Sequence, residues 1–243
     1  MTKKHTPRTS GPDFYVKNRF KLKTKNHQDF LTLLESESTN MVFGSGPAGT
    51  GKTYLAVMAG LKALKNKECD NLVYIRSVVE SADRNIGSLP GEIDEKFSPW
   101  TIPLMEKMQE LISDKIAINK LFTQKKIQCM PVNFARGRTF SDSFVILDEA
   151  QNCSTQELKT ILTRFGEGSK YVVLGDPDQS DINGKSGYYA TKEKFSNKES
   201  EKNGIYVINF EKDDIVRSGI LKFIVEMLET KVTSTWTVGG ERR

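Results

Sequence analysis

The chain has 243 residues, of which 37% are hydrophobic and 28% charged, and its formal net charge is +5. This length suits one domain with short appendages, and the composition is that of an ordinary globular protein. No run approaches 18 apolar residues and no apolar stretch follows the charged N-terminus, so we expect neither a transmembrane helix, a membrane partner nor a secretory signal. Three cysteines without a short spacing argue against a disulfide framework and a zinc site, which favours a cytoplasmic location.

The positive charge is concentrated at the N-terminus. Residues 1–27 carry eight Lys or Arg and one acid, so their net charge is +7 and that of the remainder is near −2. The segment is either a solvated tail or an arm that meets nucleic-acid phosphates by counterion release. We therefore divide the chain into a basic arm (1–25), a folded domain (26–229) and a C-terminal tail (230–243).

Short β-branched runs alternate with helical stretches along the chain. This pattern predicts an α/β domain in which a parallel sheet is sandwiched by helices. One helix is predicted over Lys52–Lys65 from its periodicity. The predicted strands are Met41–Phe43, Leu72–Arg76, Ile127–Met130, Phe144–Leu147, Tyr171–Leu174 and Ile205–Asn209.

Three further segments have distinct patterns. Ser154 and Glu157 have the spacing of a capping box that starts a helix, and Gly166 stands where its C-cap is expected. Residues 191–204 are mostly polar and predict an exposed insertion. A last helix is predicted from Asp213 to Glu229. Its expected buried stripe is Ile220, Leu221, Ile224, Val225 and Leu228.

The stretch "GPAGTGKT" fits the pattern G-x-x-x-x-G-K-[ST] between a predicted strand and a predicted helix. Its glycines allow successive backbone N–H groups to converge on phosphate oxygens at the helix N-terminus. Lys52 is expected to reach the β- and γ-phosphates, and the Thr53 hydroxyl to bind Mg²⁺. The motif predicts a nucleoside triphosphate site. Its candidate ligands are Gly46, Pro47, Ala48, Gly49, Thr50, Gly51, Lys52 and Thr53.

In "VILDEAQN" a predicted buried strand ends in two acids, Asp148 and Glu149. A strand-end Asp completes a Mg²⁺ shell in such sites, which makes Asp148 the expected metal partner. Glu149 is then the expected base or orienter of an attacking water, although an acid can also favour the start of a helix. A small-molecule kinase does not need this second acid, so the pair favours an NTP hydrolase.

A third apolar strand ends in "VVLGDPDQ", with Gln179 three residues beyond Asp176. If the strands before the phosphate loop and the acid pair flank it, this end points at the γ-phosphate. Gln179 is then expected to sense the phosphate or orient the water, as glutamines do in other NTPases. The alternative is a surface turn.

Together, "GPAGTGKTYLA", "RGRTF", "VILDEAQN", "LTRFGEGSK", "LGDPDQSD" and "DIVRSG" resemble PhoH-like proteins in order and spacing, over residues 26–228. That family comprises ATPases related to the first core domain of superfamily 1 helicases. The resemblance implies a P-loop NTPase with a single RecA-like core that uses ATP and Mg²⁺. It further implies a bacterial cytoplasm or a phage-infected host cell as the location.

The resemblance also implies roles for single residues. Gln28 stands where such helicases read the adenine edge, Arg76 lies near a motif that contacts nucleic-acid backbone, and Arg217 resembles an arginine that approaches the γ-phosphate. A homo-oligomer, with a hexameric ring as the expected form, would let a neighbouring subunit supply an arginine finger. The candidates for this finger are Arg136, Arg138, Arg164 and Arg217.

Two functions of different classes follow from these patterns. The first is a helicase-like ATPase that acts on RNA or single-stranded nucleic acid. Its candidate aromatic residues for stacking on bases are Phe134, Tyr188 and Tyr189. For Phe134, burial in the core is the expectation. The second is an ATP-controlled assembly or scaffolding protein whose 191–204 insertion faces a protein partner.

Overall fold

The computed structural model describes residues 12–18, 20–77, 100–182, 184–216, 223–224 and 227. Its centre is a six-stranded sheet with the order β3-β2-β4-β5-β1-β6, in which every pairing is parallel. All six predicted strands are confirmed, each to within two residues at either end. The strands are β1 (Met41–Ser45), β2 (Asn71–Arg76), β3 (Ile127–Pro131), β4 (Ser143–Asp148), β5 (Lys170–Gly175) and β6 (Ile205–Asn209).

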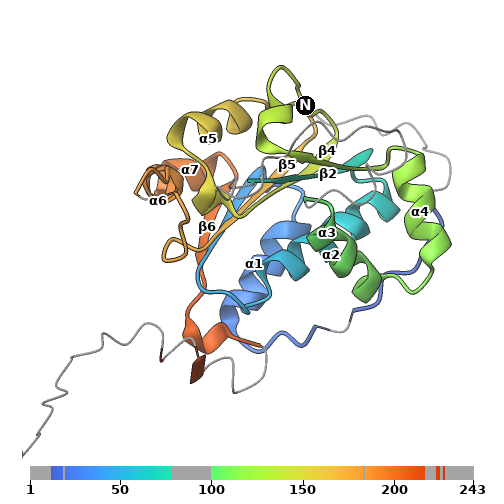
Figure 1. Ribbon diagram of the computed structural model, residues 1–243, viewed down its shortest axis with the longest axis horizontal. Helices are drawn as coiled ribbons and strands as arrows, with labels where there is room; N and C mark the ends of the chain where they lie inside the picture. Colours follow the sequence, from blue (N-terminus) through green and yellow to red (C-terminus); the bar gives the residue numbers. More distant parts are fainter. Residues whose placement is uncertain are drawn as a thin grey trace, which may run out of the picture.

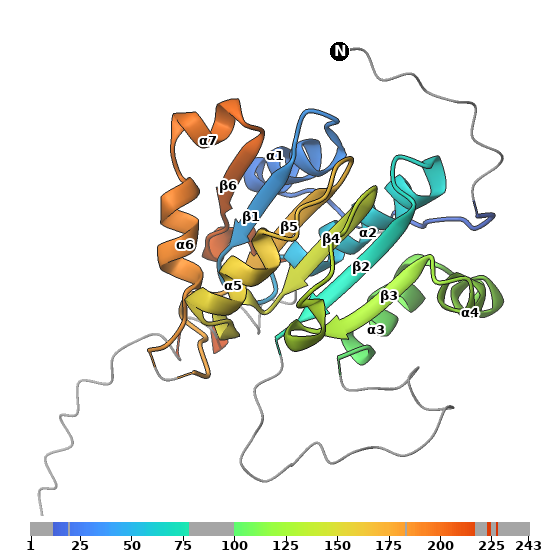
Figure 2. The same cartoon turned by 90° about the horizontal axis from the view of Figure 1, so that it is seen from above.

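Helices cover both faces of this sheet, as predicted (Figures 1 and 2). One face carries α1 (Lys25–Glu35), α2 (Lys52–Asn66), α3 (Ile102–Leu111) and α4 (Lys115–Thr123). The other carries α5 (Thr155–Leu162), α6 (Tyr188–Phe195) and α7 (Lys198–Lys202). Short 3₁₀ turns stand at Val132–Ala135, Ala150–Asn152 and Lys212–Asp214. No helix of the described ranges is long and apolar enough to cross a membrane.

The sheet order places three strand ends together. β5 pairs with β1 on one side and with β4 on the other, so the strands before the phosphate loop and the acid pair do flank it. Because all three run in parallel, their carboxyl ends meet at one edge, as Figure 2 shows. The strand that precedes Gln179 therefore lies between the two strands that carry the phosphate loop and the acid pair, as the prediction for Gln179 required.

The start of α5 is confirmed and its end differs from the prediction. Ser154 and Glu157 form the capping box, since each side chain accepts a hydrogen bond from the other residue's backbone N–H. The C-cap is Thr163 and not Gly166. A Cβ on Gly166 would lie 2.3 Å from the carbonyl oxygen of Phe140, so a close backbone approach, which periodicity does not report, explains that glycine.

The predicted insertion at 191–204 is exposed over most of its residues, as expected, but it does contain fold elements, because α6 and α7 occupy it and pack against β6. Lys192 is 5% exposed and donates to Asn209 Oδ1 at 3.0 Å, while the Phe195 ring stacks on Phe43 with centroids 5.4 Å apart. Tyr188, fully buried at the start of α6, donates its hydroxyl to the Gly44 carbonyl at 3.1 Å. A few contacts thus anchor a segment whose overall composition is polar.

The predicted last helix is confirmed at three described residues, whereas its start and the burial of its stripe differ from the prediction. Asp213 and Asp214 lie in a 3₁₀ turn, and Phe223, Ile224 and Met227 are helical. The Ile224 side chain is 43% exposed, so its predicted burial is wrong within this chain. The rest of the predicted stripe and residues 230–243 lie outside the described residues.

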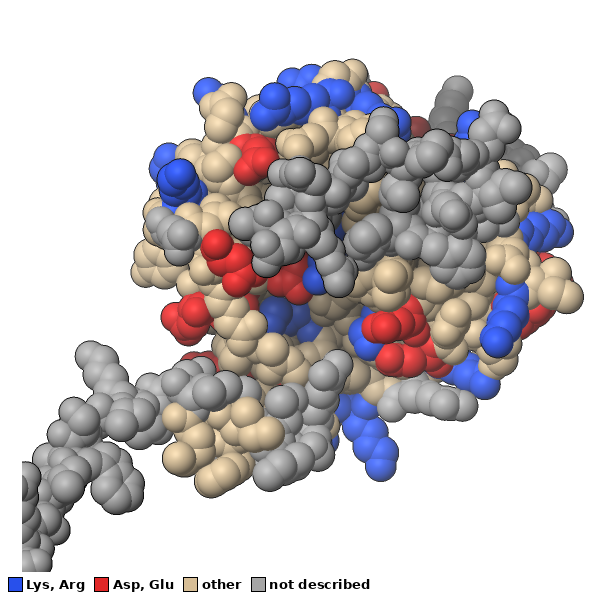
Figure 3. Space-filling model, in the orientation of Figure 1, with Lys and Arg blue, Asp and Glu red and all other residues tan. Residues whose placement is uncertain are grey.

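Part of the basic N-terminal segment packs against the domain. Phe14 is 6% exposed within the core, and the Lys17 N–H donates to the Leu111 carbonyl at 2.8 Å. The expectation of a solvated tail is therefore wrong for residues 12–18, whereas the nucleic-acid arm and the boundary at residue 25 stay predictions. Figure 3 shows Lys and Arg at the upper rim of one face and also at its sides and lower edge, with Asp and Glu interspersed.

Candidate active site

A cavity of about 590 Å³ opens at the edge where the carboxyl ends of β1, β4 and β5 meet. Most of the predicted site residues that the structure describes line it: Ala48, Gly49, Gly51, Lys52, Thr53, Asp148, Glu149 and Gln179. Its other lining residues are Phe20, Tyr54, Lys107, Glu110, Gln151, Gly175, Asp176 and Val216. Gln28 is exposed on α1 and does not line the cavity, and Arg217 lies outside the described residues.

The phosphate loop has the backbone that its glycines permit. Gly46, Gly49 and Gly51 have φ values of 142°, 83° and 85°, which side-chain-bearing residues rarely adopt. Gly51 is the N-cap of α2, and no side chain caps this helix end. The first N–H groups of α2 thus face the cavity without a side-chain acceptor, which suits an anion.

Lys52 is buried in the floor of this loop. It is 9% exposed, and its Nζ donates to the carbonyl oxygens of Gly46 at 2.6 Å and Pro47 at 2.7 Å. Burial lowers the pKa of Lys52 to about 8, against the opposing effect of the Asp176, Asp148 and Glu149 carboxylates. A desolvated ammonium at the base of an anion cradle is well placed to contact phosphate.

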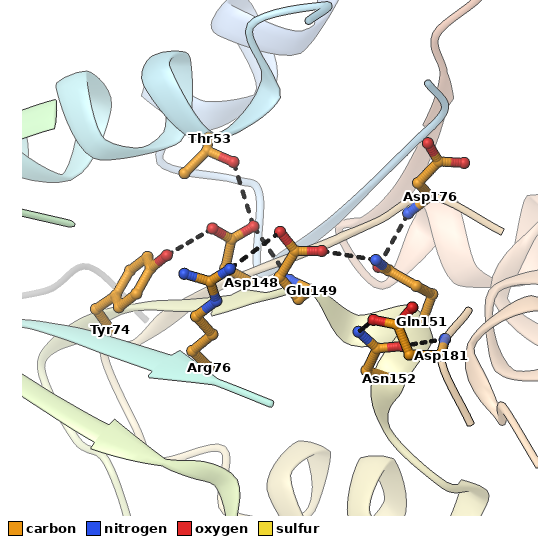
Figure 4. A network of polar contacts seen from close by, with 9 residues as sticks. All are labelled: Thr53, Tyr74, Arg76, Asp148, Glu149, Gln151, Asn152, Asp176 and Asp181. Atoms are coloured by element: carbon orange, nitrogen blue, oxygen red, sulfur yellow. Dashed lines mark hydrogen bonds and ion pairs between the residues drawn. The ribbon is translucent and has the colours of Figure 1, made fainter. Parts of the chain in front are cut away.

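The two predicted metal ligands meet beside the loop. Thr53 Oγ1 donates to Asp148 Oδ1 at 3.2 Å, and the Tyr74 hydroxyl donates to Asp148 Oδ2 at 2.5 Å (Figure 4). Burial raises the pKa of Asp148, although the hydrogen bond from Tyr74 opposes this. A hydroxyl and a carboxylate oxygen are donors that Mg²⁺ prefers, so this pair fits the ion. The strand residue Tyr74 had no sequence signal.

Glu149 is held on both of its carboxylate oxygens. Gln151 Nε2 donates to Glu149 Oε2 at 2.6 Å, and Arg76 Nη2 lies 3.5 Å from Glu149 Oε1. The backbone of Glu149 has a φ of 55°, an uncommon value for a residue with a side chain. Such strain persists only where surrounding contacts hold it, and Glu149 lines the cavity.

Gln151 joins the ends of two strands. It is 2% exposed, and its Oε1 accepts from the Asp176 N–H at 3.1 Å (Figure 4). Because the oxygen is occupied by a donor, the amide NH₂ must face Glu149. The sequence prediction missed this role, although the quoted "DEAQN" motif contains the residue. The exposed Gln179 lies in the loop that Ser180 and Asp181 fasten to residues 151–152.

The predicted arginines and aromatics have mixed placements. Arg136 and Arg138 are exposed and Arg164 is half-buried, and none of the three lines the cavity. Phe134 is 67% exposed, so its expected burial is wrong. Tyr188 is fully buried and cannot stack on a base, whereas Tyr189 is 59% exposed.

Known proteins are similar in sequence to this chain. The family model for PhoH-like protein matches residues 19–229. The PhoH-like protein of Bacillus subtilis is 36% identical over 208 residues, which cover 85% of this chain and 63% of that protein. The PhoH-like protein of Mycobacterium leprae is 36% identical over 206 residues, covering 84% and 57%. Protein PhoH of Escherichia coli is 35% identical over 199 residues, covering 81% and 55%.

The chain therefore spans between 55% and 63% of the length of these relatives. A solved structure, the Sulfolobus solfataricus SWI2/SNF2 ATPase core in complex with dsDNA, is similar over 82% of this chain and 46% of that chain. Its sequence identity is 12% and the TM-score is 0.48.

Proposed function

The chain belongs to the PhoH-like protein family, and on that premise we propose that it binds ATP with Mg²⁺ and hydrolyses the β–γ phosphoanhydride. One observation carries this proposal: the Glu149 carboxylate lines the same cavity as the phosphate loop and the Thr53–Asp148 pair. A cavity lined by a phosphate loop and by side chains that can bind a metal ion is expected in any P-loop protein. The adjacent second carboxylate suits one that transfers the phosphoryl group to water.

Each group has one task in this reaction. The N–H groups at the start of α2 and the Lys52 ammonium hold the phosphates. Thr53 and Asp148 would hold Mg²⁺, which would supply neutralisation of phosphate charge. Glu149 accepts a proton from the water as the water oxygen bonds to the γ-phosphorus, and ADP leaves with the electron pair of the broken bond. Gln179 orients the water or senses the γ-phosphate. Gln28 as the adenine reader stays a prediction.

RNA or another single-stranded nucleic acid is the proposed substrate of the ATPase. Its support is the exposed ring of Phe134 close in sequence to the exposed Arg136 and Arg138, because single strands bind where aromatic rings and cations alternate. Contacts between such cations and phosphates release counterions. Binding should therefore weaken steeply as salt rises.

We also propose a ring-shaped homo-oligomer, with six subunits as the expected number. No arginine among the described residues lines the cavity, so none of these is placed to act as a finger within its own subunit, and a neighbouring subunit could supply one. Arg136, Arg138 and Arg164 remain the candidates within the described residues.

The test is ATP hydrolysis by the purified protein with and without single-stranded RNA, beside the variants Lys52→Ala and Glu149→Gln. We expect RNA to stimulate hydrolysis. Lys52→Ala should abolish hydrolysis together with ATP binding. Glu149→Gln should lower kcat about 10²- to 10⁴-fold with ATP still bound, since that is the range for a general base.

Hydrolysis that is indifferent to RNA would contradict the nucleic-acid substrate and favour the assembly function. A measurement of oligomer size with and without ATP then tests the assembly function, because that function requires the oligomer size to change when ATP binds. For that alternative, residues 191–204 keep an exposed surface that could face a protein partner, although their helices also pack on β6. Full activity of Glu149→Gln would overturn the proposed hydrolytic mechanism.

A further inference from the structure

The cavity has an aromatic end as well as a polar one. Phe20, from the N-terminal segment, and Tyr54, from the first turn of α2, line the same cavity as Lys52 and Thr53. The two rings are stacked, with centroids 5.5 Å apart and planes 28° apart. They are the aromatic residues among the described lining residues. The cavity thus offers flat apolar surface at one side and phosphate ligands at the other.

Phe20 is fixed against the phosphate loop from several directions. A Cβ on Gly51 would lie 2.3 Å from Phe20 Cε2, so the ring lies directly over this glycine. The ring is T-shaped to the ring of the buried His27, with centroids 5.2 Å apart and planes 70° apart. His27 Nε2 in turn lies 2.9 Å from the Thr50 carbonyl oxygen. The ring is therefore held before any ligand arrives, which lowers the entropic cost of using it.

We propose that Phe20, backed by Tyr54, is the platform on which the base of the bound nucleoside triphosphate stacks. The proposal rests on the proposed function, since a triphosphate at the loop is what brings a base to this end. A planar base can gain free energy from an aromatic face without a matching hydrogen-bond pattern. Gln28, by contrast, is exposed and does not line the cavity.

The competing explanation is that Phe20 only packs against the loop and supports its shape. The two explanations differ in which ligands they affect. A base platform contributes to the binding of ATP but not to that of inorganic tripolyphosphate, which has the phosphates alone. A support for the loop contributes to both.

The experiment measures Kd for Mg-ATP and for Mg-tripolyphosphate with the full chain and the variants Phe20→Leu and Phe20→Trp. Leu keeps an apolar side chain and loses the ring, while Trp keeps an aromatic face. Tyr15→Leu is the matched control, because Tyr15 belongs to the same segment, is 71% exposed and does not line this cavity. Thermal unfolding of each variant shows whether it is folded.

We expect Phe20→Leu to raise Kd for ATP about tenfold and to leave Kd for tripolyphosphate unchanged, with Phe20→Trp close to the parent. Equal losses for both ligands would overturn the proposal and identify Phe20 as a support of the loop. Unchanged Kd values for both would overturn it as well. If neither ligand binds the parent chain, or if Lys52→Ala binds both normally, the proposed function itself fails.

Discussion

The two ends of the cavity are built in different ways. The phosphate end is made mainly of residues from three short motifs, and most of their side chains are polar. The base end is made of Phe20, which precedes the phosphate loop by more than twenty residues, and of Tyr54 in α2. Under the proposed function, the first end holds the groups that react or bind charge, whereas the second offers an aromatic surface to the base.

This difference explains why the two ends have different sequence signals. Chemistry at phosphate requires particular residue types at particular spacings, so its residues form a motif. Stacking requires only an aromatic face in the right place, which many residues at many positions can supply. The predictions below test whether the two ends are as separable as this implies.

Gly51 belongs to both ends, so its replacement should have the largest effect. Ala at this position meets a φ of 85° and would place Cβ 2.3 Å from the Phe20 ring. We expect Gly51→Ala to weaken the binding of ATP and tripolyphosphate together by about 100-fold, since strain of about 1–2 kcal/mol adds to the overlap. Calorimetric titration with each ligand measures this.

The matched control for that variant is Gly137→Ala. Gly137 has a φ of 75°, but a Cβ there would meet nothing within 4 Å, and the residue does not line the cavity. It should lose about 1–2 kcal/mol of stability and bind both ligands normally. If Gly51→Ala weakened the binding of only one of the two ligands, Gly51 would belong to one end of the cavity and not to both.

Gln151 acts at the phosphate end alone. Gln151→Leu removes the donor to Glu149 and the acceptor for the Asp176 N–H, while keeping a buried side chain of similar size. We expect kcat for ATP hydrolysis to fall about tenfold, from the loss of a hydrogen bond to a charged group worth ~1.5 kcal/mol. Kd for ATP should be unchanged.

Gln151→Glu provides the complementary measurement. A second carboxylate beside Glu149 favours protonation of the pair, so the acidic limb of the kcat–pH profile should move to higher pH. A merely structural role for Gln151 predicts a lower Tm and an unmoved profile. A rise of Kd in either variant would show that the residue also shapes the binding surface.

Asp214 contacts residues near the start of α1 and does not line the cavity, so its replacement should have the smallest effect on the binding of either ligand. Its carboxylate accepts from Asn26 Nδ2 at 2.8 Å and from the Glu211 N–H at 2.7 Å, at the start of α1. Burial acts to raise the pKa of Asp214, but hydrogen bonds from Thr24, Asn26 and Glu211 outweigh it and hold the pKa below its usual value.

A carboxyl group whose pKa is lowered in the folded state stabilises that state above its unfolded pKa, about 3.9, and loses the contribution as pH falls through the folded pKa. Asp214→Asn should therefore lower the free energy of unfolding by about 1–2 kcal/mol at pH 7. The difference from the parent should shrink on acidification below about pH 4. Thermal unfolding at several pH values measures it, and a constant difference would contradict this assignment.

Much of the site could be predicted because its parts are local in the chain. Gly46, Gly49 and Gly51 were expected to allow an unusual backbone, and all three have positive φ. The six strands were confirmed because β-branched runs buried on both sides of a parallel sheet leave a clear pattern. The helices α6 and α7 were missed because a segment that is mostly polar and has only a few buried residues leaves almost no hydrophobic pattern in the sequence.

The sequence by itself determined the phosphate loop, the acid pair at the end of β4 and the parallel sheet that carries them. The tertiary structure decided the partners of these groups: Tyr74 on Asp148, Gln151 and Arg76 on Glu149, and Phe20 over Gly51. The physical reason is that a motif records what one stretch of backbone must do. Contacts between stretches depend on strand order and on which side chains meet across the sheet edge, and no spacing within a single motif reports them.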